Sequence, residues 1–571
     1  MFLKMIRNVF SEFRRYKNDD KSRKYEKNIK TNNLINRHRH ITMGTNLSKD
    51  ITPPPLTLQD CLVNGTISLS RYYYYRKHLD TYSEAIERDE TLLSNKRKRR
   101  KVVEKPKAVR KRQRSVKRHK LMVRDEDGSL REIKPVDTLW YLLYVSNPPT
   151  SKRMSKVFRL RFRLPYQSFI SLSHDISNHD IFIRWTRVDA VGDPPSNLKL
   201  LLLGALRFIG RNWTLDDICE ANGISIETNR QFLHAFMEYG STVLYQKWVL
   251  NANINSQIAE QEKVFRRAGF DGCIGSSDAT HIPMLRCPHW AHNSHKGFKL
   301  SVPARTYNVT CDHSRRILGT TMGHPGTWND KTLILFDQLI CDVKKGKAYA
   351  DYEFELYEHK VNGNIETVKY GGVWFMVDNG YLSWSCTVPP DNNGKTYEVI
   401  RFSEWLESMR KDVECLFGIM KGRFSILRYG FRFHSITNCD KMWLTCCALH
   451  NLLLKEDGLD KNWETGVRSD WEKMNTMRGS VTSQYNLVIP YALTRLHRNF
   501  TDGSLEQEDS SDFDENRSSL SERCAKYTRN GKRMVASMPL KLFRECLVQH
   551  FDIRFKNNDI VWPTRFNRPS F

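Results

Sequence analysis

The apolar residues between positions 402 and 429 recur at spacings of three and four. They are Met409, Val413, Leu416, Phe417, Met420, Phe424 and Leu427. This is the period of an amphipathic helix, so we expect one helix over 402–429 with Ser403 as its N-cap. Glu414 lies at the edge of the apolar stripe. It can either reach into a cleft or pair in solvent with Arg410, four residues earlier.

Two short apolar runs upstream of this helix each end in an acidic residue. Residues 373–377 predict a buried strand followed by Asp378, and residues 273–277 predict another that ends at Asp278. Sheet enzymes place functional groups at such strand ends. Two acids there and Glu414 on the helix would make an oxygen-only site, which suits Mg²⁺ or Mn²⁺.

The remaining pattern predicts hairpins over 306–321 and 351–369 and helices over 328–343 and 441–454. We therefore expect an α/β catalytic domain over 255–456. Gly418 and Gly422 predict a helix face pressed closely on a neighbour. Asp412 is expected in solvent.

Several short sequence motifs in this region, taken in their order along the chain, resemble those of one family of transposases. They are GCIGSSDATHI (272–282), HKGFK (295–299), GHPGTWNDKTL (323–333), VNG (361–363), VDNGYL (377–382), RKDVECLFGIMKGRF (410–424) and LHNLLL (449–454). Together they resemble the DDE transposases of the PIF/Harbinger superfamily, closest to its plant-transposon-protein branch, over residues 157–454. The sequence departs from the branch pattern after Asp378, where Asn379 stands in place of a glycine.

The resemblance implies a ribonuclease-H-like fold and a nuclease that cleaves double-stranded DNA at transposon ends and joins the 3′-hydroxyl to target DNA. It implies two divalent cations, Mg²⁺ or Mn²⁺, with Asp278 bridging them and Asp378 and Glu414 binding one each. A Myb-like DNA-binding protein and a homo-oligomer are the partners it suggests. Arg410 and Lys421 are candidates for gripping DNA phosphates, or are charges in solvent. Asp330 is a rival acid, which we interpret as a carboxylate at a helix N-terminus.

Residues 135–250 predict a helical region with segments at 197–208, 215–221 and 226–239. The last two, separated by a Gly turn, resemble a helix-turn-helix, in which Asn229, Arg230 and His234 would face DNA. An ordinary helical bundle explains the same pattern.

Charge is concentrated at the start of the chain. The net charge of the 571 residues is +27, of which residues 1–120 carry +20, with 32 Lys and Arg against 12 Asp and Glu. We expect residues 1–134 to be a mostly disordered basic arm. Residues 96–120 hold 15 basic residues and one acid, which indicates a nuclear localisation signal that also binds phosphates.

The cysteines, the lengths of the apolar runs and the C-terminal residues give further predictions about the protein. Thirteen cysteines without a C-x-x-C motif indicate a reducing compartment, and no apolar run predicts a membrane span. Cys287, His289, His292 and His295 lack the usual spacing of a zinc site. Residues 457–571 predict an accessory segment with an acidic linker at 501–516 and an amphipathic helix at 540–551.

Two other functions fit the same residues. A host-adopted nuclear DNA-binding or regulatory protein could keep the fold without needing catalysis. A nuclease without transposition would share the three acids.

The basic cluster at 96–120 generates a first prediction. Deleting it should leave the protein in the cytoplasm, because the deletion removes most of the clustered positive charge that import depends on. Microscopy of a fluorescent fusion measures this, and undiminished nuclear accumulation would contradict it.

Overall fold

The computed structural model describes residues 122–124, 127–188, 194–250, 258–297, 299–360, 362–391, 393–460 and 520–562. The predicted localisation signal and the acidic linker lie outside these residues. Within them, no helix is long and apolar enough to cross a membrane.

A mixed sheet forms the centre of the described chain, which confirms the α/β class. Its strands run in the order β10-β9-β3-β4-β5, and β6 also pairs with β4. The first strand in sequence, β3, pairs antiparallel with β4 and parallel with β9. The bounds are β3 (Cys273–Pro283), β4 (Ala304–Cys311), β5 (Ile317–Thr320), β6 (His324–Pro325), β9 (Trp374–Met376) and β10 (Thr387–Val388).

Helices cover both faces of this sheet. On one face the long helix α14 (Tyr397–Arg423) buries Val413 and Leu416 against Tyr307 and Val309 of β4. On the other, Ile340 packs with Phe375 of β9. The short elements after β6 are α12 (Asp330–Leu333), η8 (Ile334–Phe336) and α13 (Gln338–Lys344), whereas η7 (His289–Ala291) and α11 (His292–His295) lie in the chain between β3 and β4. Both faces are therefore closed by apolar contacts, as a mostly buried sheet requires.

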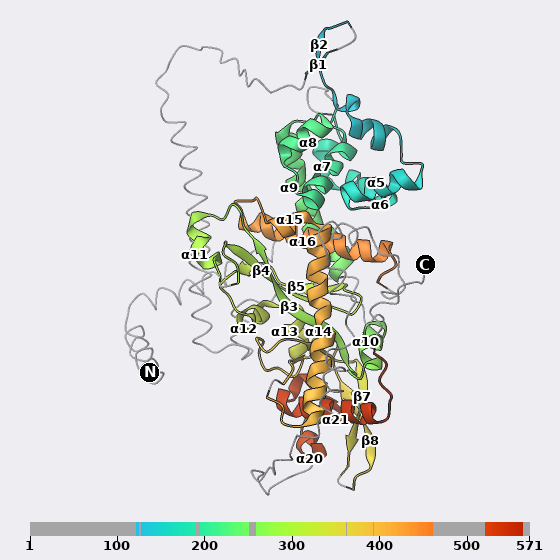
Figure 1. Ribbon diagram of the computed structural model, residues 1–571, viewed down its shortest axis with the longest axis vertical. Helices are drawn as coiled ribbons and strands as arrows, with labels where there is room; N and C mark the ends of the chain where they lie inside the picture. Colours follow the sequence, from blue (N-terminus) through green and yellow to red (C-terminus); the bar gives the residue numbers. More distant parts are fainter. Residues whose placement is uncertain are drawn as a thin grey trace, which may run out of the picture. The chain divides into compact units, whose positions relative to one another are not determined.

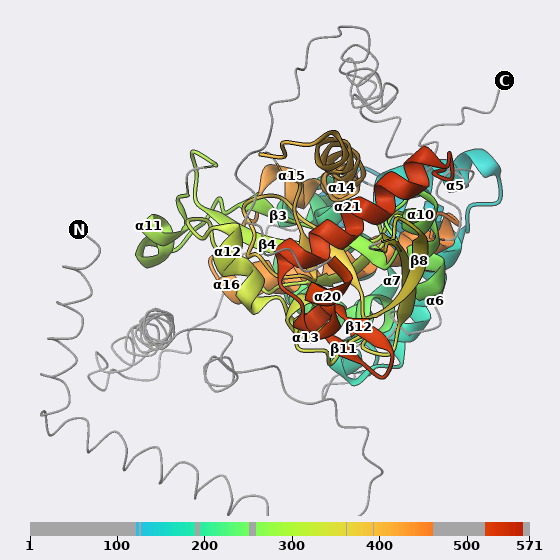
Figure 2. The same ribbon diagram turned by 90° about the horizontal axis from the view of Figure 1, so that it is seen from below.

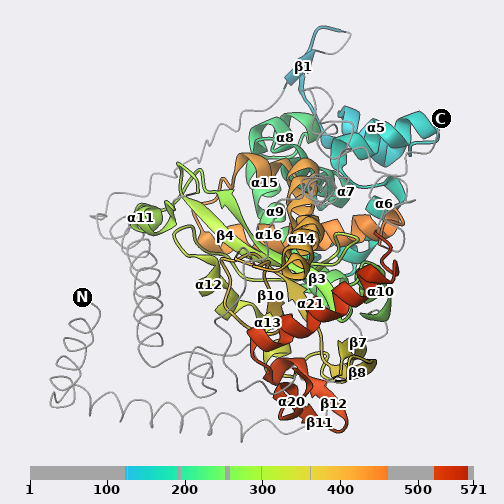
Figure 3. The ribbon, with the colours of Figure 1, turned by 60° about the horizontal axis from the view of Figure 1, so that its bottom comes forward.

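The C-terminal segment completes a second sheet, in the order β11-β12-β8-β7. Figure 3 shows these strands together, with the C-terminal elements beside β7 and β8. The bounds are β7 (Glu353–His359), β8 (Ile365–Gly371), α20 (Leu520–Ala525), β11 (Thr528–Arg529), β12 (Lys532–Met534), η9 (Val535–Ser537) and α21 (Leu540–Lys556). Helix α21 lies beside α14 (Figure 2), where Phe551 packs on Phe402 and Trp405. The helix predicted at 540–551 is thus confirmed.

The helical region joins the sheet domain through one continuous core. Helix α9 lies against α16 (Figure 1), the π-helix η4 also contacts α16, and the buried residues of both regions form one cluster. The bounds are η1 (Pro135–Asp137), η2 (Tyr141–Ser146), α5 (Lys152–Phe162), α6 (Tyr166–Ser177), η3 (Asp180–Trp185), α7 (Leu198–Arg211), α8 (Leu215–Asn222), α9 (Ile226–Tyr239), η4 (Gly240–Leu244), η5 (Gln246–Leu250), α10 (Ile258–Arg267), α15 (Ser425–Tyr429) and α16 (Ile436–Glu456). The predicted helices at 197–208, 215–221, 226–239 and 441–454 are confirmed.

The long helix differs from its prediction at both ends. It starts at Tyr397 rather than Ser403, because Phe402 and Trp405 also find an apolar neighbour in α21. Ser403 lies inside the helix, where its hydroxyl accepts a hydrogen bond from the Asp391 backbone N–H. The helix ends at Arg423, since Phe424 has an extended backbone and α15 follows.

Two further expectations were wrong. Strand β3 does not end at Asp278, because its residues continue to pair with β4 up to Pro283. The helix predicted over 328–343 is three short pieces, since Asp337 leaves the helical conformation and caps α13. At the end of the arm predicted to be mostly disordered, the rest of which lies outside the described residues, β1 (Met122–Arg124) and β2 (Leu130–Glu132) form a hairpin. Its turn is supported by Gly128 at a φ of 80°.

The glycines provide a stability prediction. A Cβ at Gly240 would lie 2.4 Å from the Oγ1 atom of Thr445 on α16, whereas Gly422 has nothing within 4 Å, contrary to the close packing expected there. Gly240→Ala should lower the free energy of unfolding by about 1–3 kcal/mol, because the packed helices must shift. Gly422→Ala should raise it by about 0.5–1 kcal/mol. Thermal unfolding measures both, and shifts of the same sign would contradict the packing.

Candidate active site

Two of the three predicted acids lie side by side where β3 and β9 run in parallel. Ser276 pairs with Met376 in this ladder. Asp278 and Asp378 each follow two residues later, so the strand register brings them to the same level of the sheet. They lie close enough for the charge of Asp378 to affect the protonation of Asp278.

Asp330 lies in the same place, at the first turn of α12. A Cβ built on Gly380 would be 2.9 Å from a carboxylate oxygen of Asp330 and 2.9 Å from one of Asp378. The Gly380 backbone N–H donates to Asp378 Oδ1 at 2.8 Å. Position 380 therefore needs a glycine, because a side chain would push into both carboxylates. Asp330 is at a helix start, as predicted, and is also a neighbour of the candidate acids.

Glu414 contacts Arg410, which in turn contacts Asp278. The guanidinium of Arg410 contacts Glu414 Oε1 at 3.0 Å and Asp278 Oδ2 at 3.3 Å. The Glu414 side chain is 49% exposed, whereas that of Arg410 is 8% exposed. The structure thus contains the Arg410–Glu414 pair that the helical spacing indicated, but with the arginine buried against the sheet acid instead of in solvent.

A polar network holds the sheet side of the site. The Tyr381 hydroxyl donates to Asn308 Oδ1 at 2.5 Å, and the Asn308 amide donates to Asp337 at 2.7 Å and Ser277 at 3.0 Å. Because these groups are buried, each bond also satisfies a polar atom that would otherwise be costly. The network fixes the chain on either side of Asp278 and Asp378.

Burial governs the electrostatics of the acids. Burial, together with the smaller effects of the charges of Asp378 and Asp330, raises the pKa of Asp278 to about 6, although the Ala279 backbone N–H and Arg410 lower it. Burial likewise raises the pKa of Asp330, where Lys299 lowers it and Asp378 raises it. The neighbouring His281 has its pKa lowered to about 4 by burial and by Lys299 and Lys421. The charged forms of Asp278 and Asp330 are consequently costly in the folded protein.

The donor chemistry fits a hard divalent cation, since all the converging side chains offer carboxylate oxygens. Their present positions are less suited. Among the described residues, no group of three or more His, Cys, Asp or Glu side chains is arranged to hold a metal ion. This includes Cys287, His289, His292 and His295. The cation on the carboxylate of Asp278 is instead the Arg410 guanidinium.

The residues predicted to face DNA from the helical region lie differently. The prediction that Asn229 faces DNA was wrong. Its side chain is buried and hydrogen-bonds to the Asn222 side chain at 2.8 Å and to the Ile224 carbonyl at 2.8 Å. Arg230 is exposed and holds Glu227 through two bonds of 2.9 and 2.6 Å. His234 is half-buried beside Phe433. DNA contact by Arg230 and His234 stays a prediction.

The two candidates on α14 are less exposed than expected. Lys421 is half-buried, and burial lowers its pKa. Arg410 is held by acids on both sides. Neither is a freely solvated charge, so a phosphate contact from either would require the side chain to change partners.

Sequence reasoning missed a buried charge cluster behind the site. Asp412, expected in solvent, is fully buried and accepts from Arg315 at 2.8 Å and contacts His313 at 2.7 Å. Its position two residues before Glu414 carries no signal of this, because the partners come from the β4–β5 turn. That turn folds over α14 only in the tertiary structure.

Comparison with known proteins adds one finding. Residues 247–461 match the family described as plant transposon protein. This supports a transposon-derived protein family and a transposase-related function. No curated protein and no solved structure matches the chain. The matched segment contains Asp278, Asp330, Asp378 and Glu414.

The raised pKa of Asp278 generates a stability prediction. The folded protein binds this proton more tightly than the unfolded chain, whose pKa is near 3.8, so folding stability falls as the pH rises through about 4 to 6. Without divalent cations at pH 8, Asp278→Asn should raise the free energy of unfolding by about 1–3 kcal/mol. The gain should vanish near pH 4. Denaturant titrations at both pH values measure it.

Asp412→Asn is the matched control. It should lower the free energy of unfolding by about 3–5 kcal/mol, because it breaks a buried ion pair with Arg315. Destabilisation by Asp278→Asn at pH 8 would show that the Asp278–Arg410 attraction outweighs the cost of burial.

Proposed function

We propose that this chain is a DDE-type transposase of the PIF/Harbinger kind, whose Asp278, Asp378 and Glu414 serve two divalent cations, Mg²⁺ or Mn²⁺. It would cleave DNA at transposon ends by hydrolysis and join the freed 3′-hydroxyl to target DNA. The observation that carries this is the parallel register of β3 and β9, which sets Asp278 beside Asp378 inside the family-matched segment.

The strand order supports a ribonuclease-H-like domain over residues 255–456. The first strand of the sheet, β3, is central; on one side β4 pairs antiparallel with β3 and β5 pairs antiparallel with β4, and on the other side β9 and β10 follow in parallel. The third acid would come from a helix packed on that sheet, as Glu414 does on α14. These are the relations that the resemblance implies for such an enzyme.

Different residues of the chain would hold the cations, keep the site in place and bind DNA. Bound cations would activate the attacking oxygen and stabilise the leaving one. Asp278 and Asp378 would hold the site on the sheet, and the Tyr381–Asn308 bond would keep their strands in place. Duplex DNA would approach over α14, where Arg410 and Lys421 offer positive charge. The basic arm would add contacts to phosphates that depend on salt, and would direct the protein to the nucleus.

One observation favours the second candidate, a host-adopted DNA-binding protein that does not need catalysis. The described residues hold no three-ligand group arranged for a metal ion. A protein of this kind would bind duplex DNA with or without divalent cations. It would tolerate loss of the acids.

The cleavage of a labelled duplex separates the two. The duplex should carry the inverted repeat that flanks the coding sequence, and the protein is the full chain with Mg²⁺ or Mn²⁺. Asp278→Asn, Asp378→Asn and Glu414→Gln should each slow cleavage by about 100-fold or more, because a bound cation supplies several kcal/mol of transition-state stabilisation. Binding of the duplex, measured by fluorescence anisotropy, should persist.

Glu398→Gln is the control for Glu414→Gln, since it makes the same change about 24 Å earlier on the same helix. It should cleave as the natural chain does. Asp330→Asn decides the place of the neighbouring acid. If the folded Asp330→Asn protein is as slow as Glu414→Gln, Asp330 belongs to the catalytic set. Binding of the duplex without cleavage by the natural chain would favour the DNA-binding candidate, whereas full cleavage by all the acid variants would overturn the assignment of the acids.

A further inference from the structure

Arg410 is the centre of an ion-pair cluster at the candidate site. Its guanidinium contacts Glu407 at 2.7 Å, Glu414 at 3.0 Å and Asp278 at 3.3 Å. The two helix acids lie one turn before and one turn after it. One side chain of α14 therefore ties the helix to the sheet acid.

The Arg410 guanidinium contacts the carboxylate oxygen of Asp278 that a divalent cation would bind. Asp278 Oδ1 already accepts from the Ala279 backbone N–H at 2.7 Å, so Oδ2, which faces Arg410, is the oxygen available to a further partner. A divalent cation at Asp278 and the guanidinium in its present place would repel each other. The cation and this position of Arg410 are hence alternatives.

The cluster also shows where Arg410 could go. Its partners Glu407 and Glu414 are 40% and 49% exposed, whereas Asp278 is 17% exposed. The guanidinium is consequently at the boundary between the buried acid and the solvent-facing side of α14. A long side chain at such a boundary can turn outward, and a phosphate offers it a matching two-pronged partner.

We propose that Arg410 is a resident cation that couples metal binding to DNA binding. In the metal-free protein, Arg410 forms ion pairs with Asp278 and with Glu414. When duplex DNA arrives, the guanidinium moves to a phosphate and leaves Asp278 and Glu414 to a divalent cation. The inference rests on the proposed function, and it makes Arg410 a positioning residue that acts through the acids.

Such coupling is reciprocal. If DNA removes Arg410 from the acids, DNA must raise the affinity for the cation by the same factor by which the cation raises the affinity for DNA. Deleting the guanidinium should remove this mutual effect. A purely structural arginine would not produce it.

The test measures Mn²⁺ binding to the full chain by electron paramagnetic resonance of the free ion, with and without the transposon-end duplex. For the natural chain, the duplex should tighten Mn²⁺ binding by about fivefold or more, within the usual range of coupling between sites. Arg410→Gln should bind Mn²⁺ about tenfold tighter without DNA, because no resident charge opposes the ion. The duplex should then change its affinity by less than about twofold.

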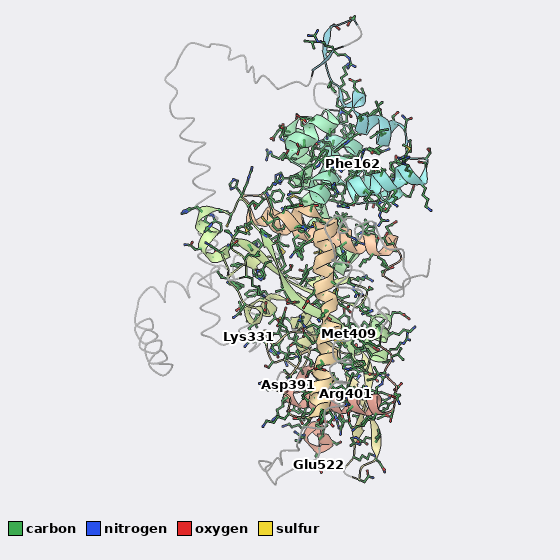
Figure 4. The ribbon with its side chains drawn as sticks, viewed as in Figure 1. Phe162, Lys331, Asp391, Arg401, Met409 and Glu522 are labelled. Carbon is green, nitrogen blue, oxygen red and sulfur yellow. The ribbon has the colours of Figure 1, made fainter. Side chains whose placement is uncertain are left out.

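Arg401→Gln is the matched control. Arg401 lies on the same helix (Figure 4), is buried to a similar degree, and pairs with Asp552 of α21 at 3.0 Å, away from the acids. Its substitution should leave Mn²⁺ affinity and the effect of DNA unchanged. If Arg410→Gln does not fold, Arg410→Lys gives the same answer, since the ammonium lacks the planar fork with which the guanidinium holds both carboxylates, and Mn²⁺ should bind more tightly than in the natural chain.

The outcomes separate this inference from the proposed function. If Asp278→Asn binds Mn²⁺ as well as the natural chain, the proposed metal site is wrong. If Asp278→Asn loses Mn²⁺ while a folded Arg410 variant keeps the natural affinity and the natural effect of DNA, the site stands and the role of Arg410 is overturned.

Discussion

The parallel pairing of β3 with β9 places Asp278 and Asp378 side by side in a largely buried position, with Asp330 next to them. Burial and the neighbouring negative charge favour the neutral forms of Asp278 and Asp330. Other groups of the site offset the cost of this buried negative charge. Backbone N–H groups bond to Asp278 and Asp378, and Arg410 supplies a positive charge. The polar network through Asn308 keeps the acids from moving apart.

Helix α14 can present Arg410 and Glu414 to this site because both its halves are anchored. Its first half packs in the cluster that includes Phe543 and Phe551 of α21, and its second half packs with β4 and the helical region. The helix is thus held between two cores, with the acids near the middle. Near this middle, the end of the long Arg410 side chain contacts Asp278 of the sheet.

The C-terminal segment belongs to the same body, although the family match ends at residue 461. Asp271, just before β3, bonds to His550 and Arg554 of α21, each at 2.8 Å. Strand β12 extends the sheet of β8 and β7, whose hairpin lies in sequence between Asp330 and Asp378. The segment therefore supports the strands that carry the acids.

Local sequence patterns determined most of the elements of this protein. The periods of three to four and of two residues predict α7 to α9, α16, α21 and both hairpins, because burial of one face requires that spacing. The order of acids and family words likewise indicated Asp278, Asp378 and Glu414 as candidates. Where the two cores extend an element, as at the start of α14, local pattern was insufficient.

The tertiary structure alone decided the surroundings of each charge. Arg410, Asp412 and Asn229 occupy positions that a helical period leaves ambiguous, and their partners lie on other elements. Whether a polar side chain is solvated or buried in a bonded network depends on those distant segments, since the free energy of a buried charge is set by what surrounds it. The sequence thus determined which acids the site could use, and the packing of α14 on the sheet decided that an arginine lies among them.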